Sequence, residues 1–192
     1  MHLLAKRISS FLVSKSFILQ QEHHIYSYCF EILLSELAFW GSIFIIAFCS
    51  NLICPTIIYL LGFCLFRSIA GGYHASTHLR CLLLSISFYL VFILLFQHIS
   101  TSKNVCLLFI SFAYFIFLFF APIDHKNKRF TQDQYITLRF KLLSLMIIFF
   151  VISIILMLCS YTMTLFCLCY GCWQAAVAII LAAYQKRKEV AL

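Results

Sequence analysis

The sequence predicts an all-α polytopic membrane protein, in which about six transmembrane or re-entrant helices follow an N-terminal amphipathic surface helix. Three observations lead to this fold class. Of the 192 residues, 64% are hydrophobic and 10% are charged, and the mean hydropathy is +1.03. Soluble domains carry about a quarter charged residues, and a soluble fold of this length could not bury so much apolar surface. Long apolar runs also alternate with short polar breaks, so we expect one membrane domain over 1–192.

The N-terminal arm, residues 1–35, precedes the long apolar runs. Apolar side chains recur at roughly helical spacing over 2–20, but Lys6, Arg7 and Lys15 interrupt them. That pattern predicts an amphipathic helix lying on the membrane surface rather than a span or a signal peptide. The apolar run 37–66 is too long for one untilted span. Pro55 disfavours helix just before it, so we expect two segments, 37–50 and 55–66, which either both cross or form a re-entrant hairpin.

Four further apolar segments complete the predicted set of six, at 82–96, 105–121, 142–158 and 165–183. Lys and Arg are concentrated in the N-terminal arm, in 67–80, in the loop 122–141 and in the C-terminal tail, whereas the breaks near 51, 100 and 161 contain one, Lys103. Six crossings place all the basic regions on one side, which the positive-inside rule makes cytoplasmic. The chain should therefore reside in the cytoplasmic membrane.

The net charge of +8 suits contact with anionic headgroups of the lipid bilayer or with an acidic partner. The basic residues form no dense stripe, so nucleic acid is not an expected partner. Nine of the ten cysteines lie in or beside apolar runs, where a thiol packs as a small apolar side chain. The tenth, Cys81, has charged neighbours.

The stretch 67–81, "RSIAGGYHASTHLRC", interrupts the apolar chain with two arginines, two histidines, a glycine pair and a cysteine. Gly71 and Gly72 permit backbone conformations and close approaches closed to other residues. Cys81 stands where a helix enters the bilayer, beside Arg80, a setting that favours a nucleophilic thiolate. A histidine in reach would complete a Cys–His dyad, with the histidine as base and then as acid.

Spacing alone leaves three interpretations of this stretch open. His78 is one helical turn from Cys81. His74 is about 10.5 Å away along a straight helix, so it can act only if the chain turns. His74, His78 and Cys81 could also hold zinc with an open fourth position, as in a zinc-dependent membrane hydrolase. Alternatively, these polar residues simply face headgroups. A small transporter or exporter subunit is a further alternative, weakened by the scarcity of ionisable residues within the spans.

The same stretch resembles the core motif of the accessory gene regulator protein B (AgrB) family, the membrane cysteine peptidases of peptide quorum sensing. The resemblance is carried by Arg67, Gly71, Gly72, His74, Ala75 and Cys81, with the cysteine seven residues after the histidine. The loop "FAPIDHKNKRF" is similar to a second family stretch through Ala121, Pro122, Asn127 and Lys128, although Arg129 stands where a proline is common.

The resemblance implies that Cys81 is the nucleophile and His74 its base, in preference to His78. It implies a cysteine endopeptidase, needing no metal or other cofactor, that removes the acidic C-terminal tail of a small AgrD-like propeptide. The enzyme thioester would then be resolved within the peptide as a thiolactone or lactone. The charge distribution already places this stretch at the cytoplasmic face, and the resemblance implies a homodimer.

The remaining residues expected at this site are assigned to the substrate or to orientation of the dyad. Arg67, Gly71, Gly72 and Arg80 are expected to contact the propeptide, with the arginines steering its acidic tail or stabilising the oxyanion. Arg80 is at least as well suited to anchor a helix end at the headgroups. Ser85, one turn beyond Cys81, and Asp124, if its loop folds back, are candidates for a third member, although a serine within a helix usually serves packing.

Overall fold

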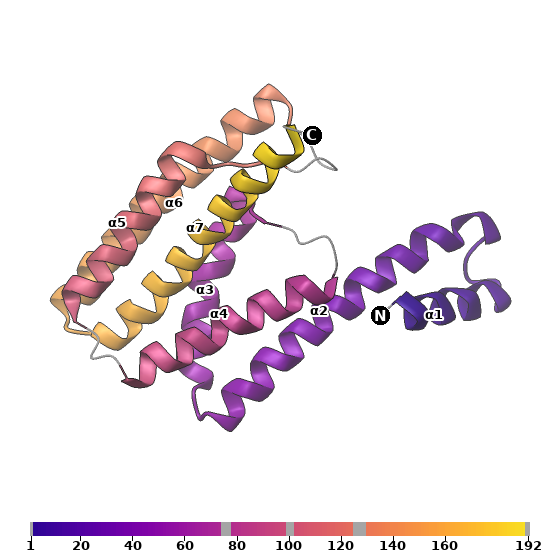
Figure 1. Cartoon of the computed structure of the whole chain (residues 1–192), viewed down its shortest axis with the longest axis horizontal. Helices are drawn as coiled ribbons and strands as arrows, with labels where there is room; N and C mark the ends of the chain where they lie inside the picture. Colours follow the sequence, from indigo (N-terminus) through magenta and orange to yellow (C-terminus); the bar gives the residue numbers. More distant parts are fainter. Residues whose placement is uncertain (1, 74–77, 99–101, 125–129, 191–192) are drawn as a thin grey trace. The chain divides into compact units, whose positions relative to one another are not determined.

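The computed structural model describes residues 2–73, 78–98, 102–124 and 130–190 (Figure 1). Within these ranges the chain forms seven α-helices, one 3-10 turn and no strand. The elements are α1 (His2–Ser14), the turn η1 (Gln20–Glu22), α2 (His23–Cys49), α3 (Ile53–Ala70), α4 (His78–His98), α5 (Lys103–Phe120), α6 (Gln132–Leu158) and α7 (Thr162–Val190).

Six helices, α2 to α7, are long and apolar enough to cross a membrane. The predicted fold class is therefore confirmed: the chain is an all-α, multi-pass membrane protein. The run 37–66 contains the C-terminal half of α2 and most of α3. A turn at 50–52, in which Asn51 has a φ of 55°, separates the two helices. Pro55 lies in the first turn of α3, where the N–H that proline lacks has no helical acceptor.

Two helices extend further than hydropathy indicates. Residues 23–35 of the predicted N-terminal arm belong to the same helix, α2, as the first apolar segment. The predicted loop 122–141 likewise ends early, because α6 begins at Gln132. Thr131 and Gln134 form a reciprocal capping box there, which satisfies N–H groups at the start of the helix.

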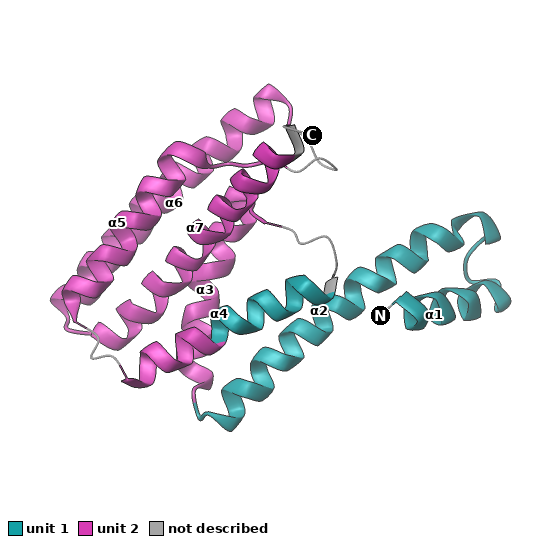
Figure 2. Ribbon diagram, viewed as in Figure 1, with its two compact units in different colours: residues 1–51, 75–89 teal, residues 52–74, 90–192 magenta. Residues whose placement is uncertain are grey.

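The chain comprises two compact units (Figure 2). The first contains 1–51 and 75–89, and the second contains 52–74 and 90–192. In the first unit, α1 packs against α2 through small residues, and Ala5 and Ser9 are fully buried. The side chains of Ser9 and Ser10 form hydrogen bonds with Nε2 of His23. Large apolar residues such as Leu3 and Phe11 stay exposed on α1, as expected of an amphipathic surface helix.

In the second unit, α7 is the central helix and packs against α3 and α5. The α3–α7 crossing depends on glycine. A methyl group at Gly62 would lie 2.5 Å from the carbonyl oxygen of Leu168, and one at Gly171 would lie 2.7 Å from the backbone nitrogen of Phe63. Membrane helices pack closely through such small residues because lipid supplies little hydrophobic force to join them.

Aromatic and polar contacts fix α3 against its neighbours in the second unit. Phe66 stacks on Phe117 of α5, with ring centroids 4.9 Å apart. Tyr59 donates a hydrogen bond from its hydroxyl to Oε1 of Gln174 on α7, and both residues are buried. The C-terminal end of α3, where the stretch 67–81 begins, is therefore held by packing on two sides.

Candidate active site

Cys81 lies in the first turn of α4, three residues after that helix begins at His78, and is half-buried. Arg80 beside it is exposed. His74 lies outside the described residues, so the predicted pairing of His74 with Cys81 stays a prediction. Residues 71–73, which follow α3, are not helical.

The glycine pair ends α3 and turns the chain. Gly71 has a φ of 78° and Gly72 a φ of 145°, values that residues with a side chain rarely adopt. Space is equally restrictive, because a methyl group at Gly71 would lie 2.5 Å from the carbonyl oxygen of Ile123, and one at Gly72 would overlap the guanidinium of Arg67. Both glycines are therefore required by the turn itself.

The guanidinium of Arg67 forms hydrogen bonds with two backbone carbonyls of this turn. Its Nη1 donates to the carbonyl oxygen of Gly71 at 2.9 Å, and its Nη2 donates to that of Tyr73 at 2.6 Å. A planar guanidinium can donate to two carbonyl oxygens that lie a fixed distance apart, whereas the single ammonium of lysine cannot match this geometry. The interactions made by Arg67 thus include two to the chain that leads into His74, whereas the sequence suggested contacts with substrate.

Two backbone hydrogen bonds join the turn to segments far away in sequence. The N–H of Tyr73 donates to the carbonyl oxygen of Ala178 in α7 at 2.9 Å, and the N–H of Ile123 donates to that of Ala70 at 3.0 Å. The carbonyl of Ala70 belongs to the last turn of α3, where helices leave carbonyls without partners. Figure 1 shows the end of α3, the end of α5 and the C-terminal part of α7 at the same end of the second unit.

The segment 121–124, part of the second motif, is held by charged side chains. Arg139 of α6 donates hydrogen bonds to the carbonyl oxygens of Phe117, at 2.8 Å, and of Ala121. Asp124 forms an ion pair with Lys186 of α7. Asp124 therefore has a partner in α7, and its predicted role as an orienter of His74 stays untested. Asn127 and Lys128 lie outside the described residues.

The remaining candidates have more ordinary surroundings. Ser85 is a half-buried residue within α4. All ten cysteines are free thiols, and Cys106, Cys167, Cys169 and Cys172 are buried. Among the described residues no group of three His, Cys, Asp or Glu side chains could hold a metal ion. The alternative zinc trio includes His74 and so lies partly outside that search.

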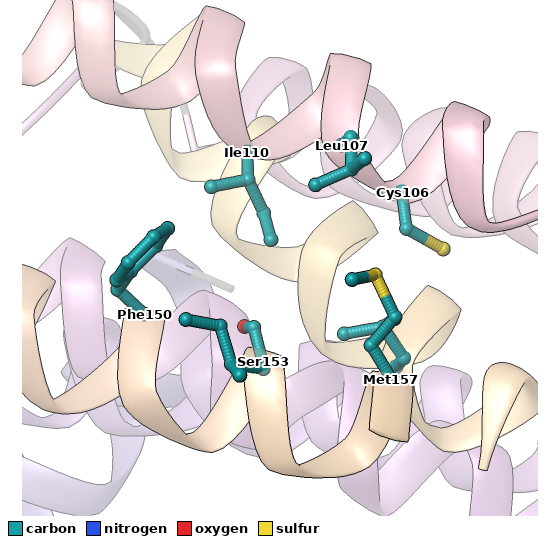
Figure 3. A pocket seen from close by; sticks show the side chains of 8 residues that line it. Cys106, Leu107, Ile110, Phe150, Ser153 and Met157 are labelled. Atoms are coloured by element: carbon teal, nitrogen blue, oxygen red, sulfur yellow. The ribbon is translucent and has the colours of Figure 1, made fainter. Parts of the chain in front are cut away.

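A small cavity of about 30 Å³ lies between α5, α6 and the start of α7 (Figure 3). Its lining is mostly apolar, with Ile110, Phe150 and Met157 among the side chains that face it. The hydroxyl of Ser153, also in the lining, donates to the carbonyl oxygen of Phe149. A space of this size is far too small for a peptide, so it is not a candidate substrate site.

A family model described as accessory gene regulator B matches residues 5–181. That range covers nearly the whole chain and includes the complete stretch 67–81. The chain belongs to the accessory gene regulator B family. No curated protein and no solved structure matches it. Membership implies a membrane protein that takes part in processing the peptide of agr quorum sensing, as a cysteine-protease-like enzyme with a peptide substrate in the membrane.

Three residues near the glycine turn of this AgrB-family protein did not stand out in the sequence: Arg139, Ala178 and Lys186. Arg139 and Lys186 are basic residues near membrane boundaries, where such residues are common for topological reasons alone. Ala178 contributes a backbone carbonyl, which no sequence pattern reveals. Their partners are 18 to more than 100 positions away, so packing had to be known before they could be found.

Proposed function

We propose that this AgrB-family protein is a cysteine endopeptidase that cleaves the C-terminal tail from a small AgrD-like propeptide and promotes its cyclisation. The observation that carries the proposal is the family match over residues 5–181, because it includes Arg67, Gly71, Gly72, His74 and Cys81 at the family spacing. The zinc hydrolase and exporter alternatives lack a comparable observation.

In the proposed reaction the sulfur of Cys81 attacks a carbonyl carbon of the propeptide, after His74 takes the thiol proton. The tetrahedral intermediate collapses by breaking the peptide C–N bond, and His74 returns the proton to the leaving amine. The tail departs with a new N-terminus, and the rest of the peptide stays on Cys81 as a thioester. A thiol or hydroxyl of the same peptide then attacks the thioester, which closes the ring and regenerates Cys81.

Two described features support this chemistry. Cys81 is in the first turn of α4, where a helix has N–H groups without intrahelical acceptors, and such groups stabilise negative charge nearby. The fixed turn at 71–73 sets the direction in which the chain enters His74. Constraint on the residue just before a base lowers the entropy lost when the base is positioned for reaction.

The membrane setting favours cyclisation over hydrolysis. A thioester persists until an internal nucleophile attacks it only where water is scarce, and a site at the mouth of a membrane helix meets this condition. The distribution of Lys and Arg along the chain supports a site at the cytoplasmic face. The exposed apolar side of α1 suits an amphipathic propeptide that shares the interface. A homodimer stays a prediction.

The test is cleavage of a candidate propeptide, taken from a short open reading frame next to this one, tagged at its C-terminus and co-expressed with the enzyme. We expect the wild type and the Cys159→Ser variant to release a short tail, followed by mass spectrometry, and Cys81→Ser to release none. Cys159 is a suitable control because it is also a free cysteine, and it is more exposed than Cys81. Intact propeptide with correctly inserted wild type, or cleavage by Cys81→Ser, would refute the proposed chemistry.

A further inference from the structure

We propose that Asp124 and Lys186 are positioning residues, whose ion pair clamps the second motif against the glycine turn and so orients the chain entering His74. This inference rests on the proposed function, because His74 is the base of that reaction. It assigns to the end of α7, and to the segment 121–124, a role in setting the rate of propeptide cleavage.

The clamp begins with the segment 121–124, which contacts the turn twice. The N–H of Ile123 donates to the carbonyl oxygen of Ala70 at 3.0 Å. The carbonyl oxygen of Ile123 occupies the space in which a side chain at position 71 would stand, 2.5 Å from an added methyl group. A shift of this segment would therefore break the hydrogen bond to the carbonyl oxygen of Ala70 and remove the contact between Ile123 and Gly71.

Helix α7 holds the same turn from another direction. The N–H of Tyr73 donates to the carbonyl oxygen of Ala178, and Lys186, two turns further along the helix, pairs with Asp124. One helix thus contacts both the residue just before His74 and the residue just after Ile123. The ion pair closes this arrangement, because it joins the segment 121–124, which contacts the end of α3, to α7, which contacts the turn.

The ion pair contributes to position more than to overall stability. The Lys186 and Asp124 side chains are 57% and 27% exposed, and exposed pairs contribute little to folding. Within the segment 121–124, Ala121 is held by Arg139 and Ile123 by Ala70, whereas the side chain of Asp124 at its end is held by Lys186. Placing like charges at 124 and 186 should therefore move the segment without unfolding the helices.

Anchoring of Lys186 at lipid headgroups is the competing explanation for this residue, since basic residues are common at helix C-termini on the cytoplasmic side. The two explanations differ in what they require of position 124. A headgroup anchor needs a positive charge at 186 whatever stands at 124, whereas a clamp needs opposite charges at the two positions in either order.

The experiment compares four proteins with the wild type: Lys186→Glu, Asp124→Lys, the charge swap that combines both, and Lys188→Glu. Lys188 is a matched control, because it is exposed on the same last turns of α7. We expect each single reversal at 124 or 186 to lower kcat for tail release about two- to fivefold, the upper part of the range that corresponds to an exposed pair, with KM unchanged. The swap should restore kcat, and Lys188→Glu should leave it unaltered.

A second measurement does not depend on cleavage. Tyr73→Cys is introduced into each protein, and the rate at which a water-soluble maleimide labels residue 73 is read by mass spectrometry in detergent. The Tyr73→Cys change keeps the backbone N–H that bonds Ala178. We expect labelling at 73 to be several times faster in the single reversals than in the wild type and to return to the wild-type rate in the swap.

The outcomes separate the clamp from the peptidase. If the swap fails to restore kcat and the labelling rate, or if Lys188→Glu behaves like Lys186→Glu, the clamp is wrong. If labelling follows the clamp but wild type releases no tail, the clamp stands and the proposed function fails. If labelling at 73 is the same in all proteins, the clamp fails whether or not the propeptide is cleaved.

Discussion

Replacing Arg67 by lysine and by methionine distinguishes a brace for the turn from a charge that attracts substrate. Arg67 donates two hydrogen bonds, at 2.9 and 2.6 Å, to the carbonyls of Gly71 and Tyr73. Methionine keeps much of the side-chain volume but removes both donors. Lysine keeps the positive charge, yet its single ammonium cannot match the fork of the guanidinium.

The size of the effect follows from the two hydrogen bonds. A hydrogen bond to a charged group contributes about 1.5–3 kcal/mol, and Arg67 is half-buried, so the lower value applies to each. Losing both weakens the ordered turn by about 3 kcal/mol, which is about a hundredfold in its population at 1.4 kcal/mol per tenfold. We expect kcat for tail release to fall about a hundredfold in Arg67→Met and at least about tenfold in Arg67→Lys.

The assay measures kcat and KM for release of the tagged tail from purified protein in detergent or vesicles, per folded enzyme. Ser68→Ala serves as the control, because Ser68 is the exposed neighbour on α3 and bonds only within its own helix turn in the described contacts. If Arg67→Lys keeps the wild-type kcat while Arg67→Met raises KM, Arg67 acts on the substrate by charge, and the brace is refuted.

Three further predictions concern glycines and the base. Gly72→Ala should abolish tail release, because a methyl there overlaps the Arg67 guanidinium and φ is 145°, whereas Gly41→Ala, with nothing within 4 Å, should retain it; equal activity in both would contradict the strained turn. Gly171→Ala should lower the unfolding temperature in detergent, since overpacking costs about 1–3 kcal/mol; an unchanged temperature would show that α3 and α7 pack less closely. His74→Ala should abolish cleavage by an enzyme that chelators leave active, whereas His78→Ala should not; the reverse result, with bound zinc, would favour the metal alternative.

Hydropathy predicted the fold class and the number of long apolar helices, because the cost of placing charges in lipid marks each span along the chain. Pro55 and its polar neighbours also predicted the division of 37–66 correctly. The ends of α2 and α6 were harder to predict, since a helix continues beyond the lipid until a cap or turn ends it. The capping box at Thr131 and Gln134 is such a local signal, and it lay inside a stretch assigned to a loop.

By itself the sequence determined the membrane class, the six long helices and the stretch that contains Cys81, because lipid burial and motif spacing act along the chain. Tertiary structure decided what surrounds the glycine turn. The contacts of Arg67 with the turn, of Ile123 with Ala70, and of Lys186 with Asp124 depend on which helix ends meet. The ends of α3 and α7 meet because these helices pack closely at Gly62 and Gly171. The hydrogen bonds there use backbone carbonyls, which every residue has, so residue types do not reveal them.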